Sequence, residues 1–325
     1  MDRSGVAWVT EHEVVEAIDL AGAIAALEGG LAHPADRGSA TMPKTHLAWH
    51  GAHTLHAVGG VVPREGIVGA KVWAHAKGAE PLLVLWDSDD GRCVAVMEAF
   101  ALGQLRTAAM SAIATRWLAS PSSRTLAVIG SGRQAGAQVA AVAAVLPIRR
   151  VFVHSPTPAH RETFAERLRE DPVAGVTDIG STSTVAEAVA DADVITTVTR
   201  SRTAFLEPQH LRDVAHVNAV GAITPERREL TECLVERCSL VVTDDAAAAR
   251  ELAVELQGAP HLVELHDVIG RPSPPGGITL FKPLGLGLAD VILGAAVLDI
   301  VDPRPTIPRP VRRPPRLSRP ASRRS

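Results

Sequence analysis

Residues 124–144 have the sequence RTLAVIGSGRQAGAQVAAVAA, and this stretch decides the fold that we predict. Residues 124–129 form an apolar run of strand length, and residues 136–144 form an alanine-rich run without proline that is typical of a helix. A glycine turn, residues 130–135, connects the two. Because a βαβ unit begins with a strand, such a turn and a helix, the stretch predicts the start of a doubly wound sheet.

The glycine turn matches the pattern G-x-G-x-x-A, in which each small residue has its own purpose. Gly130 allows the tight turn, Gly132 leaves room for a pyrophosphate beside the backbone, and Ala135 lets the helix pack closely on the strand. The free N–H groups at the start of the helix would then bind the phosphates. An ordinary strand-to-helix turn is the alternative, but the units that follow favour a dinucleotide-binding domain.

Further apolar runs of strand length follow the turn and alternate with predicted helices. The runs lie at residues 151–153, 193–199, 216–221 and 240–244, and one intervening helix is predicted over residues 158–168. Because this alternation is typical of parallel sheets covered by helices, we predict an α/β fold with a doubly wound parallel sheet.

The chain before this domain has a different pattern, a helix followed by a mostly antiparallel sheet. Apolar residues at helical spacing predict helices over residues 11–32 and 100–118. Between them we expect a loop at 33–41, apolar runs at 54–62, 67–73 and 82–86, a hairpin turn at 87–91 and a return strand at 92–97.

These patterns predict three parts of the chain. Residues 1–119 form the first domain, to which a last helix at 287–301 returns, and residues 120–286 form the Rossmann domain. From residue 302 the composition changes to proline and arginine, with eight arginines and one aspartate. No core can form there, so residues 302–325 are predicted to be a disordered tail.

Composition and charge exclude several classes of protein. A net charge of −3 gives no overall electrostatic reason to bind nucleic acid or a membrane, and no apolar run approaches the roughly 20 residues that span a bilayer. Three cysteines without metal-ligand spacing suit a reducing cytosol, so we expect a cytoplasmic protein. Four histidines between residues 46 and 56 lack carboxylate or cysteine partners at ligand spacing, so no metal site is predicted.

The end of the second Rossmann strand indicates the cofactor. NAD-binding domains carry an acidic residue there, which binds the ribose 2′-hydroxyl. This chain has Ser155 and Thr157 instead, with Arg161 beyond them, and hydroxyl groups beside an arginine suit a 2′-phosphate better. We therefore expect NADP(H) or NAD(H), with a preference for NADP(H), although Arg161 as a solvated helix residue is the alternative.

Two cations of the first domain lie in apolar surroundings. Lys71 is in the predicted strand at 67–73, and Arg106 is in the predicted helix at 100–118. A buried charge is costly unless it is paired, so both are candidates to receive a substrate carboxylate. A lysine that extends to solvent and an arginine on a helix surface are the alternative interpretation.

Five short motifs resemble, in this order, the ornithine cyclodeaminase/mu-crystallin family over about residues 11 to 300. They are GAKV at 69–72, LRTAAMS at 105–111, GSGRQA at 130–135, NAVGA at 218–222 and TLFKPLG at 279–285. The resemblance implies a Rossmann domain inserted in a discontinuous α+β domain, which binds a small imino or amino acid and forms a homodimer.

The resemblance also implies the roles of individual residues. Lys71 and Arg106 would bind the substrate carboxylate with Lys44, which stands where the family has an arginine, and Lys71 would also polarise or protonate the reacting centre. The implied cofactor site comprises Arg106, Thr107, Gly130, Gly132, Arg133, Gln134, Ser155, Thr157, Arg161, Thr199, Val220, Gly221, Ala222, Ile223, Pro283 and Leu284.

Two departures from the family pattern bear on function. The cyclodeaminases carry an aspartate in the turn after the NAVG motif, where this chain has Ile223, which cannot transfer protons. The segment between Lys71 and Arg106 is also shorter, and it places His75 and Lys77 in a loop that should border the substrate. Unusual specificity is therefore expected.

Three functions are compatible with these residues. The preferred one is an NAD(P)H-dependent reductase of a cyclic ketimine or 2-imino acid, or the reverse amino-acid dehydrogenase. The second is an ornithine cyclodeaminase that uses NAD catalytically and replaces the missing aspartate by another residue. The third is a protein that binds a nucleotide and a small carboxylate without turnover.

Overall fold

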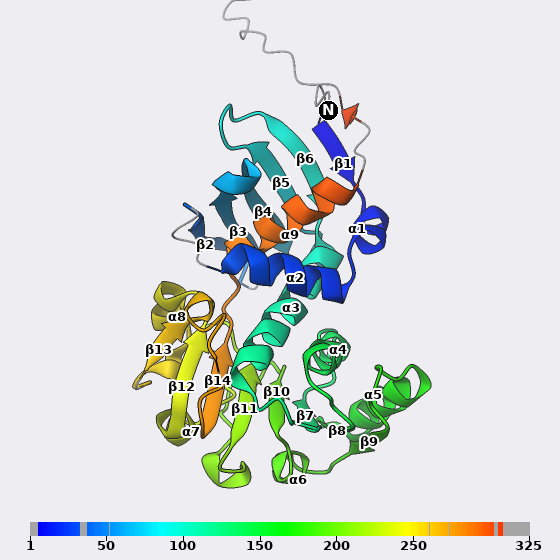
Figure 1. Ribbon diagram of the computed structural model, residues 1–325, viewed down its shortest axis with the longest axis vertical. Coiled ribbons are helices and arrows are strands. Elements are labelled where there is room, and N and C mark those ends of the chain that lie inside the picture. Colours follow the sequence, from blue (N-terminus) through cyan, green and yellow to red (C-terminus); the bar gives the residue numbers. More distant parts are fainter. Residues whose placement is uncertain are drawn as a thin grey trace, which may run out of the picture.

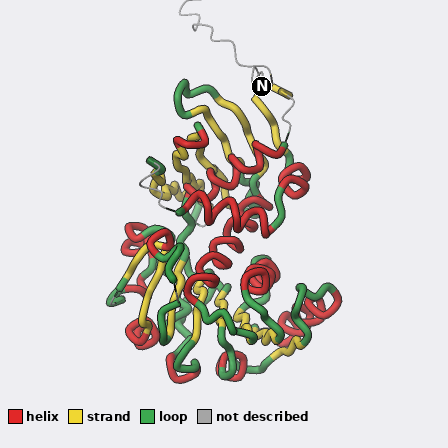
Figure 2. Tube along the Cα trace, viewed as in Figure 1, coloured by secondary structure: helices red, strands yellow, loops and turns green. Residues whose placement is uncertain are grey.

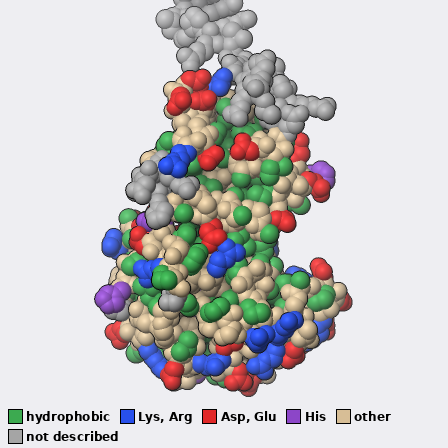
Figure 3. All heavy atoms as spheres, viewed as in Figure 1, with side chains coloured by type: hydrophobic (Ala, Val, Ile, Leu, Met, Phe, Trp, Pro, Cys, Tyr) green, Lys and Arg blue, Asp and Glu red, His purple; other side chains and the backbone are tan. Residues whose placement is uncertain are grey.

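The computed structural model describes residues 6–32, 38–51, 53–259, 261–272, 274–301 and 305–307, which form two sheets. A seven-stranded sheet occupies the upper part of Figure 1, and an eight-stranded sheet the lower part. No helix in the described ranges has the length and apolar character needed to cross a membrane. Acidic and basic side chains both occur over the lower part in Figure 3, so this face mixes the two signs of charge.

The first sheet is mostly antiparallel, and only the pairing of β1 with β6 is parallel. Its order is β15-β1-β6-β5-β4-β3-β2. Helices α2 and α9 cross it and bury an apolar core against it (Figure 1). The bounds are β1 Val6–Val9, α1 Glu11–Ala17, α2 Leu20–Leu31, β2 Ala40–Trp49, β3 His53–Val62, β4 Ile67–His75, β5 Leu82–Asp87, β6 Cys93–Glu98, α9 Gly287–Ile300 and β15 Pro305–Ile307.

The second sheet is parallel in every pair, with the order β13-β12-β14-β11-β10-β7-β8-β9. Helices flank its strands (Figure 2). The chain order reverses between β7 and β10, and ligands bind such folds at this switch point. The bounds are β7 Thr125–Ile129, α4 Ala135–Val145, β8 Arg150–His154, α5 Pro158–Glu170, β9 Asp178–Ser181, α6 Val185–Val189, β10 Val194–Thr197, β11 Ala215–Ala219, α7 Glu232–Arg237, β12 Cys238–Thr243, α8 Ala246–Leu252, β13 Leu262–Glu264 and β14 Ile278–Lys282.

Helix α3 (Phe100–Leu118) joins the two sheets (Figure 1). It packs on α2 and α9 of the first part and on α4, β11 and β14 of the second. Residues 108–115 are all buried, as expected for a helix surrounded by other elements. Its other half carries Arg106 to the border between the sheets.

The predicted α/β fold, with a doubly wound Rossmann sheet beside an α+β part, is confirmed, but some elements differ. The helix predicted over residues 11–32 is two helices, because Asp19 caps the second by accepting a 2.7 Å hydrogen bond from Gly22 N. Strand β2 begins inside the loop predicted at 33–41, of which residues 33–37 lie outside the described ranges.

The predicted tail also differs in one place. Residues 305–307 form β15, which pairs antiparallel with β1, whereas residues 302–304 and 308–325 lie outside the described ranges. Neither short strand was predicted, because three or four residues carry too little periodicity to indicate a strand.

Candidate functional site

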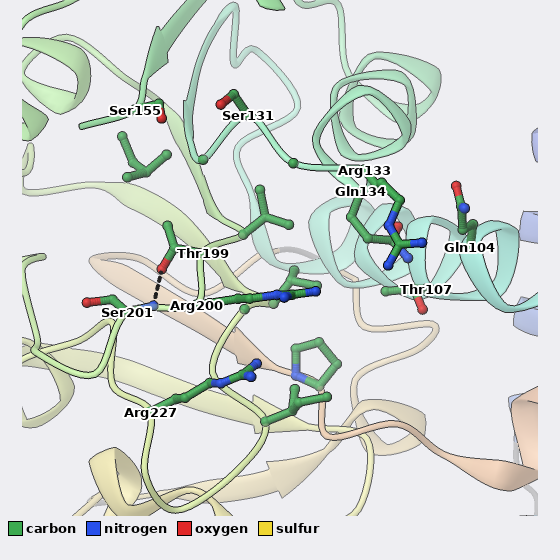
Figure 4. Close-up of a pocket in the computed structure, with 18 of the residues that line it drawn as sticks. Gln104, Thr107, Ser131, Arg133, Gln134, Ser155, Thr199, Arg200, Ser201 and Arg227 are labelled. Carbon is green, nitrogen blue, oxygen red and sulfur yellow. Dashed lines mark hydrogen bonds between the residues drawn. The ribbon is translucent and has the colours of Figure 1, made fainter. Parts of the chain in front are cut away.

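A cavity of about 1290 Å³ is lined by residues of both parts of the chain. The first part contributes β4 and α3, and the second contributes the turns after β7, β8, β10 and β11. In Figure 4, labelled side chains of α3 and the glycine turn face those that follow β10. The cavity therefore lies at the carboxyl ends of the parallel strands, where doubly wound folds bind ligands.

The glycine turn has the geometry expected for phosphate binding. Gly130 has a φ of 118°, and a Cβ there would lie 2.7 Å from the Val198 carbonyl oxygen. No atom lies within 4 Å of a Cβ built on Gly132, so this residue borders open space. Ala135 is buried and begins α4, and the turn before it lines the cavity. The N-terminus of a helix thus faces the cavity.

A buried carboxylate joins the turns after β10 and β11. Glu229 Oε1 accepts hydrogen bonds from the N and Oγ1 atoms of Thr199, both 2.7 Å long. Its Oε2 accepts from Thr197 Oγ1 at 2.9 Å, Gly221 N at 2.9 Å and Ala222 N at 3.2 Å. A Cβ on Gly221 would lie 2.4 Å from Glu229 Oε1, so this position requires glycine. One side chain therefore holds both turns in place.

A second buried glutamate supports the first. Glu255 Oε2 accepts hydrogen bonds from the backbone N–H groups of Glu229 (2.7 Å) and Leu230 (3.1 Å), and its Oε1 lies 2.7 Å from Lys282 Nζ. Sequence analysis missed both glutamates, because an acidic residue in a segment without periodicity gives no signal until the backbone donors around it are known.

The two predicted cations meet at a carboxylate that the sequence did not indicate. Lys71, on β4, places its Nζ 2.5 Å from Asp290 Oδ1, and Arg106, on α3, places its Nε 3.4 Å from the same oxygen. Asp290 is fully buried on the first turn of α9. Burial lowers the pKa of the Lys71 ammonium, and Asp290 raises it. Three elements distant in sequence thus form one charged cluster.

Lys44, on β2, adds a third positive charge to this cluster. Burial and the charge of Arg106 lower the pKa of Lys44, and Asp244 raises it. Lys44 does not line the cavity, but it interacts with residues that do. The three cations lie near two buried carboxylates, Asp290 and Asp244, and burial raises the pKa of Asp244. Three cations close together repel one another, so a ligand carboxylate beside them would be stabilised.

Asp244 also holds the turn that follows β14. Its Oδ1 accepts a 2.7 Å hydrogen bond from Leu284 N, and its Oδ2 accepts from Gly285 N (2.8 Å) and Leu286 N (3.1 Å). Pro283 and Leu284 line the cavity. The turn that carries these two residues of the implied cofactor site is therefore held by a carboxylate near the cation cluster.

The adenosine end of the cavity differs from the prediction. Ser155 lines it, but Thr157 does not, and Arg161 is turned away and donates a 3.3 Å hydrogen bond to the Ser155 carbonyl. The cavity is instead lined by Arg167 and by His160, seven residues earlier on α5. This spacing places both on one face of the helix.

Most of the residues predicted to bind the cofactor line this cavity. Ala222 is buried behind the turn. His75, predicted to lie in a loop, is the last residue of β4, and neither it nor Lys77 lines the cavity. Trp73 and Phe100, which were not predicted, form apolar walls instead. The predicted residues that line the cavity are Lys71, Arg106, Thr107, Gly130, Gly132, Arg133, Gln134, Ser155, Thr199, Val220, Gly221, Ile223, Pro283 and Leu284.

Histidine side chains of β2 and β3 contact each other and Trp73 through their rings. His46 lies 5.8 Å from His56, and His56 stacks on Trp73 at 4.9 Å, measured between ring centroids. In the part of the chain that the structure describes, no three His, Cys, Asp or Glu side chains are arranged to hold a metal ion.

Comparisons with known proteins identify the family. The model of the ornithine cyclodeaminase/mu-crystallin family matches residues 73–302. The ketimine reductase mu-crystallin of Macropus fuliginosus is 33% identical over 227 residues, which cover 69% of this chain and 70% of the relative. A Delta(1)-pyrroline-2-carboxylate reductase of Bacillus cereus is 30% identical over 250 residues, which cover 72% of this chain and 73% of the relative.

A solved structure agrees with these sequence matches. The iminosuccinate reductase of Paracoccus denitrificans in complex with NAD+ superposes with a TM-score of 0.83 at 26% identity, over 91% of this chain and 96% of that one. The match to the family model and the two relatives cover more than two thirds of the chain. This protein therefore belongs to the ornithine cyclodeaminase/mu-crystallin family.

Proposed function

We propose that this protein is an NAD(P)H-dependent reductase of a small imino acid, or the reverse amino-acid dehydrogenase. The observation that carries the proposal is one cavity shared by Lys71, Arg106 and the glycine turn. The three cations of this cluster, Lys44, Lys71 and Arg106, suit a substrate carboxylate. The similar proteins named above are reductases of imines or imino acids, which supports the same type of reaction.

The residues around the turn fit a nicotinamide dinucleotide. The N-terminus of α4 offers N–H groups to phosphates, and Gly132 borders open space. Arg133 and Gln134 line the cavity beside this turn. When bound, NAD(P)H would supply the hydride that reduces the C=N carbon.

The chain itself would bind the substrate and supply a proton. Lys71 and Arg106 would hold the carboxylate, with the charge of Lys44 behind them, and the Lys71 ammonium would give one proton to the substrate nitrogen as the C=N bond becomes a C–N bond. Lys71 then takes a proton from solvent. Ile223 cannot replace it as a donor, and the chain has no tyrosine. Catalysis would therefore depend on positioning and electrostatics.

The test is to mix the protein with NADH or NADPH and a panel of cyclic ketimines, or 2-oxo acids with ammonia. Loss of the reduced-nicotinamide absorbance with at least one imine is expected, and an inert broad panel would count against the reductase. Proline formed from ornithine without net NADH would indicate a cyclodeaminase instead. Tight cofactor binding with an inert panel would indicate a binding protein without turnover.

A preference for NADP(H) is part of the proposal, with Arg167 in place of Arg161 as the 2′-phosphate ligand. Arg167→Ala should raise the KM for NADPH about 10- to 100-fold, the loss of one charged hydrogen bond, and change that for NADH little. Arg161→Ala is the matched comparison, because Arg161 does not line the cavity. A larger effect at Arg161 would restore the sequence-based assignment.

A homodimer through the outer face of β2, β3 and β4 is also proposed. Leu47, Trp49, Leu55 and Val72 alternate with the residues on the face of Lys71, so they lie on the opposite face. They are 64%, 37%, 40% and 38% exposed, and a cluster of exposed apolar residues is typical of an interface.

Leu47→Asp should therefore produce monomers, measured by light scattering after size exclusion. Val214→Asp is the matched control, because Val214 is 54% exposed in a loop of the other part and should leave the oligomeric state unchanged. An unchanged dimer in the Leu47 variant, or a monomeric wild type, would argue against this interface.

We also propose how the chain divides into domains and in which compartment it acts. Residues 120–286 would bind the cofactor, and residues 1–119 with 287–301 would bind the substrate and form the dimer. The Lys71–Asp290 pair then lies within the substrate-binding domain. Cys93, Cys233 and Cys238 are free thiols, which supports the cytoplasm as the compartment.

A further inference from the structure

The carboxylate of Asp290 is fully buried beside two cations that border the cavity. Its Oδ1 lies 2.5 Å from Lys71 Nζ and 3.4 Å from Arg106 Nε. Its Oδ2 is buried and has no hydrogen-bond partner among the described residues. Apolar residues often stabilise a core as well as a buried ion pair does, so stability alone does not explain this carboxylate.

The backbone around Asp290 holds it close to Lys71. A Cβ on Gly287 would lie 2.3 Å from Gly59 N, so the start of α9 packs directly against the backbone of β3. In that strand Val58 is the register partner of Lys71 on β4. On the other side, a Cβ on Gly103 of α3 would lie 3.6 Å from Lys71 Nζ. The ammonium is therefore enclosed by α9, α3 and its own sheet.

We propose that Asp290 is a positioning residue that keeps Lys71 protonated and fixed at the edge of the cavity during imine reduction. The inference rests on the proposed function, because it assigns Asp290 to the proton donor of that reaction. Among the described residues Lys71 Nζ donates a hydrogen bond to Asp290 Oδ1 alone, so another proton of the ammonium can be given to a substrate nitrogen.

The charges that face Lys71 support this assignment. Burial is the largest cause that lowers the pKa of Lys71, and the charges of Arg106 on α3 and Lys44 on β2 lower it as well. Trp73 of β4 places its ring centroid 5.4 Å from Nζ. Asp290 of α9 is the opposing carboxylate, and it raises the pKa of Lys71. Without its charge, the ammonium would lose its proton at a lower pH.

The experiment compares the pH dependence of kcat in wild type, Asp290→Asn and Asp290→Glu. Wild type should lose activity at high pH as Lys71 deprotonates. This fall of kcat at high pH is the alkaline limb of the profile. In Asp290→Asn the limb should move to lower pH by about one to three units, the effect of removing an opposite charge. In Asp290→Glu the limb should stay near that of wild type while kcat falls. Asp299→Asn, an exposed site on the same helix, is the matched control.

A second measurement does not depend on turnover. The affinity for pyrrole-2-carboxylate, a planar acid without a reducible C=N bond, is measured by calorimetry across the same pH range with NADP+ present. As the pH rises, binding should weaken because Lys71 loses its charge, and in Asp290→Asn this weakening should begin at a lower pH than in wild type. This arm separates the two proposals, because a wild type that reduces no imine removes the proposed function but leaves this comparison intact.

The proposal would be overturned if folded Asp290→Asn kept the alkaline limb of wild type or bound the acid with the pH dependence of wild type. Either result would mean that the carboxylate is merely structural and does not set the protonation of Lys71. Thermal unfolding and cofactor fluorescence check the fold of each variant. Should Asp290→Asn not fold, Asp290→Glu decides: a lowered kcat with an unmoved limb supports positioning, and any other result overturns it.

Discussion

Lys71→Met is expected to reduce kcat/KM for imine reduction by about 10²–10⁴-fold, the usual contribution of a positioned proton donor. Methionine keeps the length and the apolar stem of lysine but has neither charge nor proton. Because Lys71 contacts Asp290 and does not belong to the glycine turn, the affinity for NAD(P)H should change little. Steady-state kinetics and fluorescence titration with NADPH measure the two quantities.

Lys77→Met is the matched control for this variant. Lys77 is exposed in the loop after β4 and does not line the cavity, so the activity of Lys77→Met should stay close to that of wild type.

The structure also predicts a lower unfolding temperature for Lys71→Met, since the described residues then leave Asp290 with Arg106 at 3.4 Å as its ion-pair partner. Full activity in a folded Lys71→Met would remove Lys71 from the reaction.

Glu229→Gln is expected to weaken both the fold and the binding of the cofactor. The carboxylate accepts five hydrogen bonds, and an amide turns its NH₂ group toward donors that then have no acceptor. Loss of two such bonds costs on the order of 3–6 kcal/mol of unfolding free energy, since each bond to a charged group contributes about 1.5–3 kcal/mol. Urea unfolding measures this loss.

The same substitution should reduce the affinity for NAD(P)H, because Thr199 and Gly221 line the cavity and share this anchor. Glu236→Gln is the matched control, the same change at an exposed position of α7, and should stay within about 0.5 kcal/mol of wild type. Unchanged stability in Glu229→Gln would show that the two turns do not depend on this carboxylate.

The arginines of α5 show what the sequence could and could not predict about the cofactor site. The absence of a carboxylate after β8 was evident from residues 154–157, but the choice of Arg161 assumed that the nearest arginine points to the ribose. In the fold Arg161 bonds to the Ser155 carbonyl, and Arg167, nearly two turns along α5, lines the cavity. Which face of α5 meets the cavity depends on its packing against β8 and β9, which no local pattern reports.

The sequence alone determined the class of fold and the identity of the two cations. The glycine turn between an apolar strand and a helix needs only local backbone geometry, so its pattern is legible in residues 124–144. Lys71 and Arg106 were candidates because each is a charge within an apolar run, and the family motifs around them implied their roles.

Only the tertiary structure decided what pairs with these cations and what holds the turns. Asp290 is 219 positions from Lys71, and Glu229 binds donors 30 and 32 positions before it. A buried carboxylate is stabilised by whichever donors the packing of α9 and the parallel strands brings around it. Such partners come from separate elements, so no spacing along the chain can indicate them.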